Sequence, residues 1–133
     1  MREILFRGKT EQGKWLYGYL VKGNYNTGFG IIEDHIDTGM QYVKEETVGQ
    51  FTGLMDKNDK KIFEGDIVKD GAHTFKVCYY DYGWFCYCVS SKGYILPLHK
   101  YFRIGQWDNC ENNDFRKLEV IGNIHDNPEF LGE

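Results

Sequence analysis

Short apolar runs alternate with polar, glycine-containing connections along most of the chain. Runs of this length, rich in Val, Ile, Tyr, Phe and Trp, are typical of β-strands rather than of helices. The runs that we predict to be strands are Glu3–Gly8, Lys14–Val21, Phe29–Glu33, Met40–Val43, Asp66–Lys69, Thr74–Tyr80, Trp84–Val89, Tyr94–Leu98 and Leu118–Ile124. Closely spaced strands joined by Gly and Asn turns indicate a mainly β protein, either a small barrel or a sandwich. One or two short helices are expected, one of them near His99–Ile104.

The pattern divides the chain into two parts. The first runs form a small subdomain of hairpins and strands over residues 1–50, and we place a boundary near Gln50. The remaining residues, 51–133, form the larger C-terminal domain. A chain of 133 residues is long enough for one such domain with a small appended subdomain.

The strongest hairpin signal lies in the C-terminal domain, where Asp-Tyr-Gly separates Thr74–Tyr80 from Trp84–Val89. We predict Tyr82 and Gly83 as its two-residue turn. One face then carries Phe75, Val77, Tyr79, Cys86 and Cys88, and the other carries Cys78, Tyr80, Phe85, Tyr87 and Val89. Both faces are apolar, whereas a free antiparallel sheet keeps one face polar. We therefore expect the second face to pack on the N-terminal strands or on another subunit.

The composition and the net charge limit the classes of function that we expect for the protein. Aromatic residues make up 17% of the chain, which again favours strands. The net charge is -4, and the lysines around residue 60 are interleaved with acids, which argues against non-specific nucleic-acid binding. No apolar run is long enough for a signal peptide or a membrane span. We expect a protein of the cytoplasm, with no membrane partner and with its four cysteines reduced.

The segment DKNDKK, which begins at Asp56, superficially resembles a calcium loop. An EF-hand needs an oxygen ligand at its fifth position, Gly at its sixth and Glu at its twelfth. Counted from Asp56, these positions hold Lys60, Lys61 and Ile67. The pattern fails, and an Asx-rich turn is the better interpretation.

The cysteines and histidines give no recognisable catalytic or metal-binding pattern. Cys86 and Cys88 form a C-x-C pair within an apolar strand, with Cys78 on the opposite face and Cys110 in a later loop. Structural zinc sites use wider knuckles, so we predict buried thiols that pack as small hydrophobic groups. The four histidines are scattered, and no phosphate loop or hydrolase motif is present. The sequence predicts no cofactor, no metal and no enzyme activity.

The segment EGDIVK is typical of a turn that leads into a buried strand. Gly65 and Asp66 make the turn, and the β-branched pair that follows enters the core. We assign a structural role, as turn or motif positions, to one set of residues. They are Gly53, Asp56, Asn58, Gly65, Asp66, Gly122 and Asn123.

Three stretches carry a resemblance to a known family. They are REILFRGK with the following Trp15–Gly18, TVGQFTGLMDKNDKKIFEGDIVK in the centre, and VIGNIHDNPEFL at the end. In order and spacing the sequence is similar to the YopX family, small proteins of unknown function from phages, prophages and their bacterial hosts. One departure is Asn58-Asp59, where the family has Asn-Gly. The resemblance implies a C-terminal β domain of SH3-like barrel type and assembly into homo-oligomers, and it supplies no catalytic residues.

These observations favour a non-enzymatic, homo-oligomeric phage or prophage accessory protein that acts through protein contacts in the bacterial host cytoplasm. Its expected partners are copies of itself and an unidentified protein. The alternative is a nucleic-acid-binding module that uses an aromatic barrel surface for stacking. A thiol- or metal-dependent hydrolase is the third hypothesis.

Overall fold

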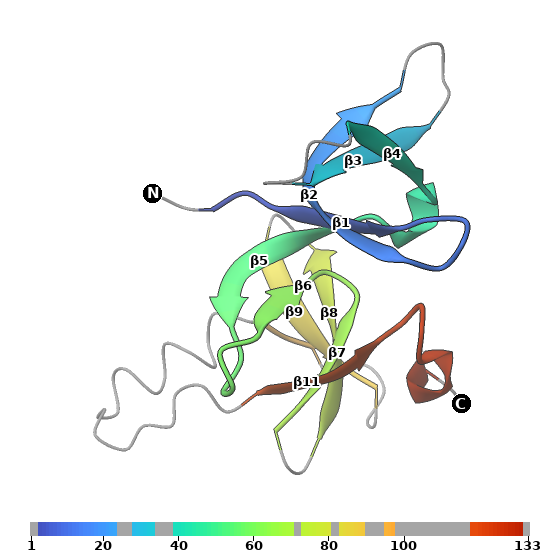
Figure 1. Ribbon diagram of the computed structural model, residues 1–133. Coiled ribbons are helices and arrows are strands. Elements are labelled where there is room, and N and C mark those ends of the chain that lie inside the picture. The colour runs from blue at the N-terminus through green and yellow to red at the C-terminus, as the bar shows by residue number, and fades with distance from the viewer. Residues whose placement is uncertain are drawn as a thin grey trace. The chain divides into compact units, whose positions relative to one another are not determined.

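The computed structural model (Figure 1) describes residues 3–23, 28–33, 39–70, 73–80, 83–89, 95–97 and 118–131. The protein is mainly β, as predicted, and its strands form two antiparallel sheets. The chain divides into two compact units, residues 1–53 and 54–133. Within the described ranges the helical elements are two short 3-10 turns, η2 (Glu45–Thr47) and η4 (Pro128–Leu131). The helix expected near residues 99–104 lies outside these ranges.

The N-terminal unit is built from a single curved sheet. Its strands are β1 (Phe6–Lys9), β2 (Trp15–Lys22), β3 (Phe29–Glu33), β4 (Met40–Val43) and the beginning of β5 (Gly49–Met55). They lie in the order β4-β3-β2-β1-β5. Alternate side chains of the strands point to opposite faces, so that Leu16 is buried while Tyr17 is exposed.

The inner face of this sheet forms the N-terminal core. Leu16, Ile31 and Val43 are buried there, and partly buried apolar residues pack against them. A Cβ atom at Gly8 would lie only 2.7 Å from Cγ2 of Val43, so the absence of a side chain lets β1 approach β4 across the core. The ends of the same strands are tied together, because the Lys44 amide donates to the Lys9 carbonyl at 2.8 Å.

The second unit holds the longer hairpin. β5 continues into it and is followed in the strand order by β6 (Lys61–Phe63). The other strands are β7 (Asp66–Lys69), β8 (Thr74–Tyr80), β9 (Gly83–Cys88), β10 (Ile95–Pro97) and β11 (Glu119–Asn123), in the order β10-β9-β8-β7-β11. The core of this unit consists of Ile62, Val68, Phe75, Val77, Cys86 and Leu118. Its sheet is open in the described part of the chain, so the structure does not confirm an SH3-like barrel.

The register of the β8–β9 hairpin differs from the predicted one. Tyr80 pairs with Gly83 and Val77 pairs with Cys86, so Gly83 belongs to the strand and the predicted Tyr82–Gly83 turn is wrong. The predicted turn would have paired Val77 with Cys88. Because this shift is even, every side chain keeps its predicted face.

The two faces of the hairpin differ in burial. Phe75, Val77 and Cys86 are buried in the core. On the other face, Phe85 and Tyr87 are half-buried, and Nζ of Lys76 lies 5.7 Å from the centroid of the Tyr87 ring. The second face is therefore partly covered, and its packing on the N-terminal strands or on another subunit stays a prediction.

Candidate functional site

The first candidate site begins at Asp56, in the turn between β5 and β6. Its side chain is fully buried, and Oδ1 accepts hydrogen bonds from the backbone amides of Asn58 (2.8 Å) and Lys60 (2.9 Å). The Asp56 amide donates in turn to the Lys60 carbonyl at 2.8 Å, which closes the hairpin. Asp59, in this turn, has a φ of 63°, a left-handed conformation that Asp tolerates better than most residues other than Gly and Asn.

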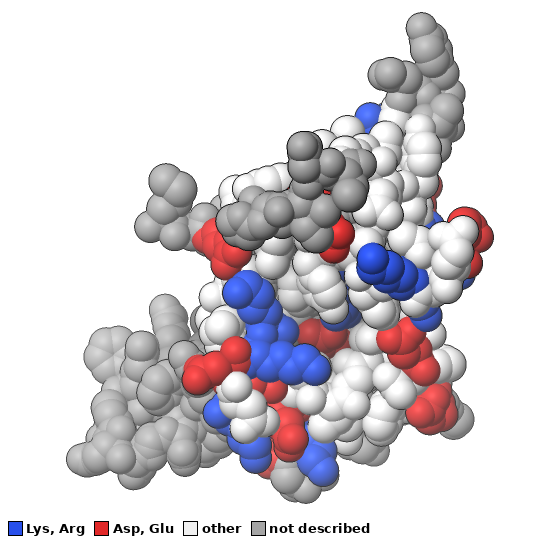
Figure 2. All heavy atoms as spheres, viewed as in Figure 1, with Lys and Arg blue, Asp and Glu red and all other residues white. Residues whose placement is uncertain are grey.

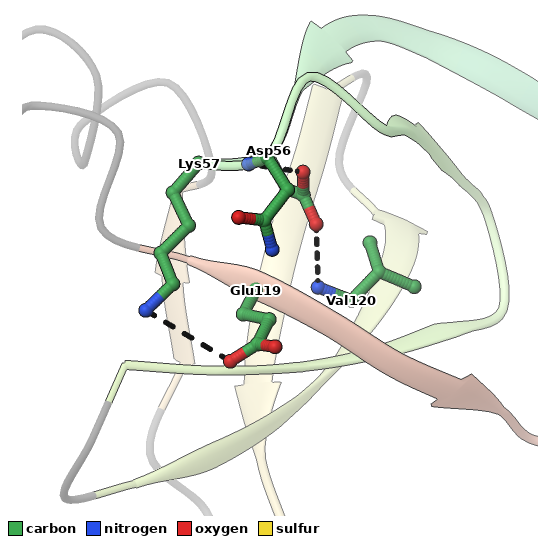
Figure 3. Close-up of polar contacts among 5 residues, drawn as sticks. Asp56, Lys57, Glu119 and Val120 are labelled. Carbon is green, nitrogen blue, oxygen red and sulfur yellow. Dashed lines mark hydrogen bonds and ion pairs between the residues drawn. The ribbon is translucent and has the colours of Figure 1, made fainter.

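The second oxygen of Asp56 reaches a strand that is distant in sequence. Oδ2 accepts a hydrogen bond from the Val120 amide at 2.9 Å (Figure 3). Beside it, the Lys57 amide donates to the Leu118 carbonyl at 2.9 Å, and Nζ of Lys57 lies 3.9 Å from Oε1 of Glu119. These contacts hold the beginning of β11 against the DKNDKK turn.

Gly65 and Asp66 hold the other end of β11. The Ile124 amide donates to the Gly65 carbonyl at 2.8 Å, and the Gly65 amide donates to the Val77 carbonyl at 2.9 Å. Gly65 has a φ of 91°, which a residue with a Cβ rarely adopts. Oδ2 of Asp66, itself buried, accepts from the Phe63 amide at 2.8 Å.

Gly122 and Asn123 lie on β11 itself, where they pair with Ile67 and Asp66 of β7. Oδ1 of Asn123 accepts from the amides of the two residues in the following turn, His125 and Asp126, each at 2.9 Å. Asn123 thus ends the strand with a side-chain-stabilised turn.

Six of the seven predicted motif residues therefore lie around one strand. We call Asp56, Asn58, Gly65, Asp66, Gly122 and Asn123 the β11 anchor. Gly53 is not part of it; that residue lies within β5 and has a φ of 91°. The oxygens of the anchor carboxylates and of Asn123 bind backbone amides, an arrangement that stabilises a corner of the fold.

The cysteines lie as the strand pattern implies. Cys86 is buried in the core, whereas Sγ of Cys78 lies on the opposite face and donates to the Phe85 carbonyl at 3.7 Å. Burial raises the pKa of both thiols, most strongly that of Cys86. No group of three or more metal-ligating side chains occurs among the residues that the structure describes. The side chain of Cys88, and all of Cys110, His35 and His99, lie outside them.

The buried Cys86 thiol gives a prediction on pH dependence. The folded protein keeps this thiol protonated because burial raises its pKa, whereas the unfolded thiol ionises near its usual value of 9.0. Its contribution to stability is thus complete below pH 9 and is lost as the pH rises further, by at most about 1.4 kcal/mol per pH unit. Urea unfolding of the wild type and Cys86→Ala should give a stability difference that shrinks above pH 9.0. A difference independent of pH would contradict this assignment.

A second candidate site lies on the outer face of the N-terminal sheet. Tyr17 and Tyr19 of β2, Ile32 of β3 and Tyr42 of β4 have exposed fractions of 45%, 54%, 36% and 53%. Tyr19 pairs directly with Ile32, and Tyr42 lies on the same face, opposite Gly30. We call these four residues the tyrosine face.

The edge of this face toward β1 carries cations. Cζ of Arg7 lies 4.8 Å from the centroid of the Trp15 ring, and Nζ of Lys9 lies 5.8 Å from it. On the face of the molecule in Figure 2, Lys and Arg side chains lie next to Asp and Glu. The tyrosine face was not predicted from the sequence. The sequence feature that could have indicated this face is the aromatic residue at every second position of β2, from Trp15 to Tyr19.

The fold and these contacts define a small, mainly β protein of two units, with an anchored C-terminal strand and a tyrosine-rich outer face. A family model described as YopX protein matches residues 5–132. Since this match spans nearly the whole chain, the protein belongs to the YopX family, as its three motifs predicted. A search of curated proteins finds no match. Along the described ranges, no helix has the length and hydrophobicity to cross a membrane.

Proposed function

We propose that the protein is a non-enzymatic, homo-oligomeric accessory protein of a phage or prophage, acting through protein contacts in the cytoplasm of its bacterial host. The observation that carries the proposal is the tyrosine face. Tyrosine is enriched at protein interfaces, where its ring is buried and its hydroxyl stays hydrated. Contiguous exposed apolar surface on a soluble protein marks an interaction site more often than chance.

The β11 anchor supports a non-enzymatic role. Its carboxylates are committed to backbone amides, and general acid-base catalysis needs such groups within reach of a substrate. The Cys86 thiol is buried, and burial raises its pKa and keeps it protonated. A nucleophilic cysteine instead needs an accessible thiolate. These observations count against the thiol-dependent hydrolase.

The SH3-like barrel fold that the family resemblance implies for the C-terminal domain stays part of the proposal.

The nucleic-acid alternative draws on the same aromatic residues, because bases stack on exposed rings. Such sites combine the rings with a basic groove that follows the phosphates. Among the residues that the structure describes, the cations on this face are Arg7 and Lys9 of β1, which lie opposite Tyr17 and Trp15 along one side of it. The charge distribution thus favours a protein partner.

Sedimentation velocity across a series of protein concentrations tests the proposal. We expect self-association that increases with concentration and no binding of a single-stranded oligonucleotide. A monomer throughout the concentration series would contradict the homo-oligomeric assignment. Tight oligonucleotide binding by that monomer would support the nucleic-acid module instead.

A further inference from the structure

We propose that Gly53 is a hinge at which the two units of the chain change their relative orientation. The chain passes from one unit to the other at a single place, because residues 1–53 form the first unit and residues 54–133 form the second. Gly53 is the last residue before that boundary, and it is the predicted motif residue that does not belong to the β11 anchor. Motion within one chain is independent of its partners, so this hinge goes beyond the proposed function.

The strand β5 is held by a different unit on each side of Gly53. Before the glycine, the Phe51 amide donates to the Leu5 carbonyl of the first unit at 2.8 Å. After it, Leu54 packs against the core of the second unit. Thr52 and Gly53 lie between these two contacts. A change of backbone dihedral at Gly53 therefore turns one unit relative to the other while both contacts are kept.

Each unit has a buried core of its own. The core of the first unit lies on β2, β3 and β4, and that of the second lies on β6 to β9 and at Leu118. Among the residues that the structure describes, the two buried clusters have no member in common. A unit with its own core does not need a fixed orientation toward its neighbour to stay folded, and relative motion of such units is common.

The backbone conformation of Gly53 agrees with this role. Its φ of 91° is far from the values of about −120° to −140° that strand residues adopt. A Cβ atom at Gly53 would have nothing within 4 Å beyond its chain neighbours, so packing does not explain the glycine. Glycine adopts positive and negative φ about equally well, and a hinge residue has to absorb a large change of φ or ψ.

The hinge has a consequence for recognition. The tyrosine face belongs to the first unit and the β11 anchor belongs to the second. Rotation at Gly53 changes the direction of the tyrosine face relative to the anchor and leaves the strand register of both units intact. A partner that contacts both units therefore selects one orientation out of several.

Residual dipolar couplings of the backbone amides of the full-length protein test the motion. The couplings of β2 and β3 define an alignment tensor for the first unit, and those of β8 and β9 define one for the second. Motion at a hinge averages the couplings of the two units to different extents. We expect the magnitudes of the two tensors to differ by more than the error of the fits. Tensors of equal magnitude would mean that Gly53 is a rigid corner, and the proposal would be wrong.

Gly53→Ala tests whether this residue is the point of rotation. A Cβ atom makes a φ of 91° unfavourable, so alanine drives the backbone toward negative φ and changes the orientations that the units adopt. Gly28→Ala is the matched control. Gly28 has a φ of 99° and also nothing within 4 Å of a Cβ atom, but it lies inside the first unit, between β2 and β3.

We expect Gly53→Ala to change the ratio of the two tensor magnitudes and Gly28→Ala to leave it as in the wild type. Couplings within each unit that still fit that unit show that both variants are folded. If the wild-type tensors differ and Gly53→Ala leaves their ratio unchanged, the units move about another residue and Gly53 is not the hinge. An equal change in both variants would also contradict the proposal, because the effect would then not arise at the boundary between the units.

Discussion

Replacing Asp56 with Ala should lower the free energy of unfolding of the second unit by about 3 kcal/mol. The substitution removes the acceptor for three backbone amides, those of Asn58, Lys60 and Val120. Because the Asp56 side chain is fully buried, water does not replace it without rearrangement of the turn. Each amide left without its partner costs about 1 kcal/mol or more.

Two further variants make this experiment specific. Asp56→Asn keeps an oxygen that can accept from Asn58 and Lys60 but places its NH2 group against the Val120 amide, so its destabilisation should be smaller than that of Asp56→Ala. Asp70→Ala is the control: Oδ1 of Asp70 accepts a hydrogen bond from the His73 amide at 2.9 Å in an exposed turn. Its loss should cost less than about 1 kcal/mol.

Urea unfolding measures the difference, and hydrogen exchange locates it. In Asp56→Ala the amides of β11 should exchange faster, since the Val120 amide loses its partner at the beginning of the strand. A loss no greater than that of Asp70→Ala would mean that the β11 anchor contributes little to stability. The motif would then need a functional explanation.

The β11 anchor gives a physical reason for the pairing of two sequence motifs. The central motif supplies Asp56 and Gly65, and the closing motif supplies the strand that they hold. The two are joined across 64 positions by the contact between Asp56 and Val120. A strand at a sheet edge has backbone groups paired on one side only, so contacts at both of its ends fix its register.

Most strands could be predicted because their apolar residues alternate and their turns contain Gly or Asn. Two strands, β5 and β6, were missed. β5 contains Gly49 and Gly53, which weaken a strand pattern, and β6 is only three residues long. Both are held by tertiary contacts, such as that of Leu54 with the core of the second unit, that local pattern does not reveal.

Asp56, Asn58 and Gly65 could be predicted as turn positions, whereas Gly53, Asp66, Gly122 and Asn123 lie in strands, and the meeting of six of these residues around one strand could not be predicted. The Asx-rich turn was visible in DKNDKK because Asp and Asn bond their own backbone. Nothing local indicated that Oδ2 of Asp56 binds Val120. The exposure of the tyrosine face could not be predicted either. Alternation with a period of two shows which residues share a face of a strand, but it does not show which face is covered.

Gly18→Ala should destabilise the N-terminal unit by about 3 kcal/mol. Gly18 lies in β2, where it pairs with Phe6 of β1 on one side and Glu33 of β3 on the other. A Cβ atom at this position would lie 2.1 Å from the Ile32 carbonyl oxygen and 2.9 Å from Cα of Glu33. These are backbone atoms, so relief requires displacement of β3 and not only a change of rotamer.

The matched control is Gly83→Ala, which also adds one methyl group to a strand glycine. A Cβ at Gly83 would have Cε1 of Phe85 as its nearest neighbour, at 3.5 Å, an ordinary contact distance. This variant should change stability by less than about 1 kcal/mol. Hydrogen exchange in Gly18→Ala should accelerate in β2 and β3, because the added methyl group separates these two strands. If Gly18→Ala is as stable as Gly83→Ala, β2 does not approach the Ile32 carbonyl this closely in solution. The strand register that forms the tyrosine face would then also be wrong.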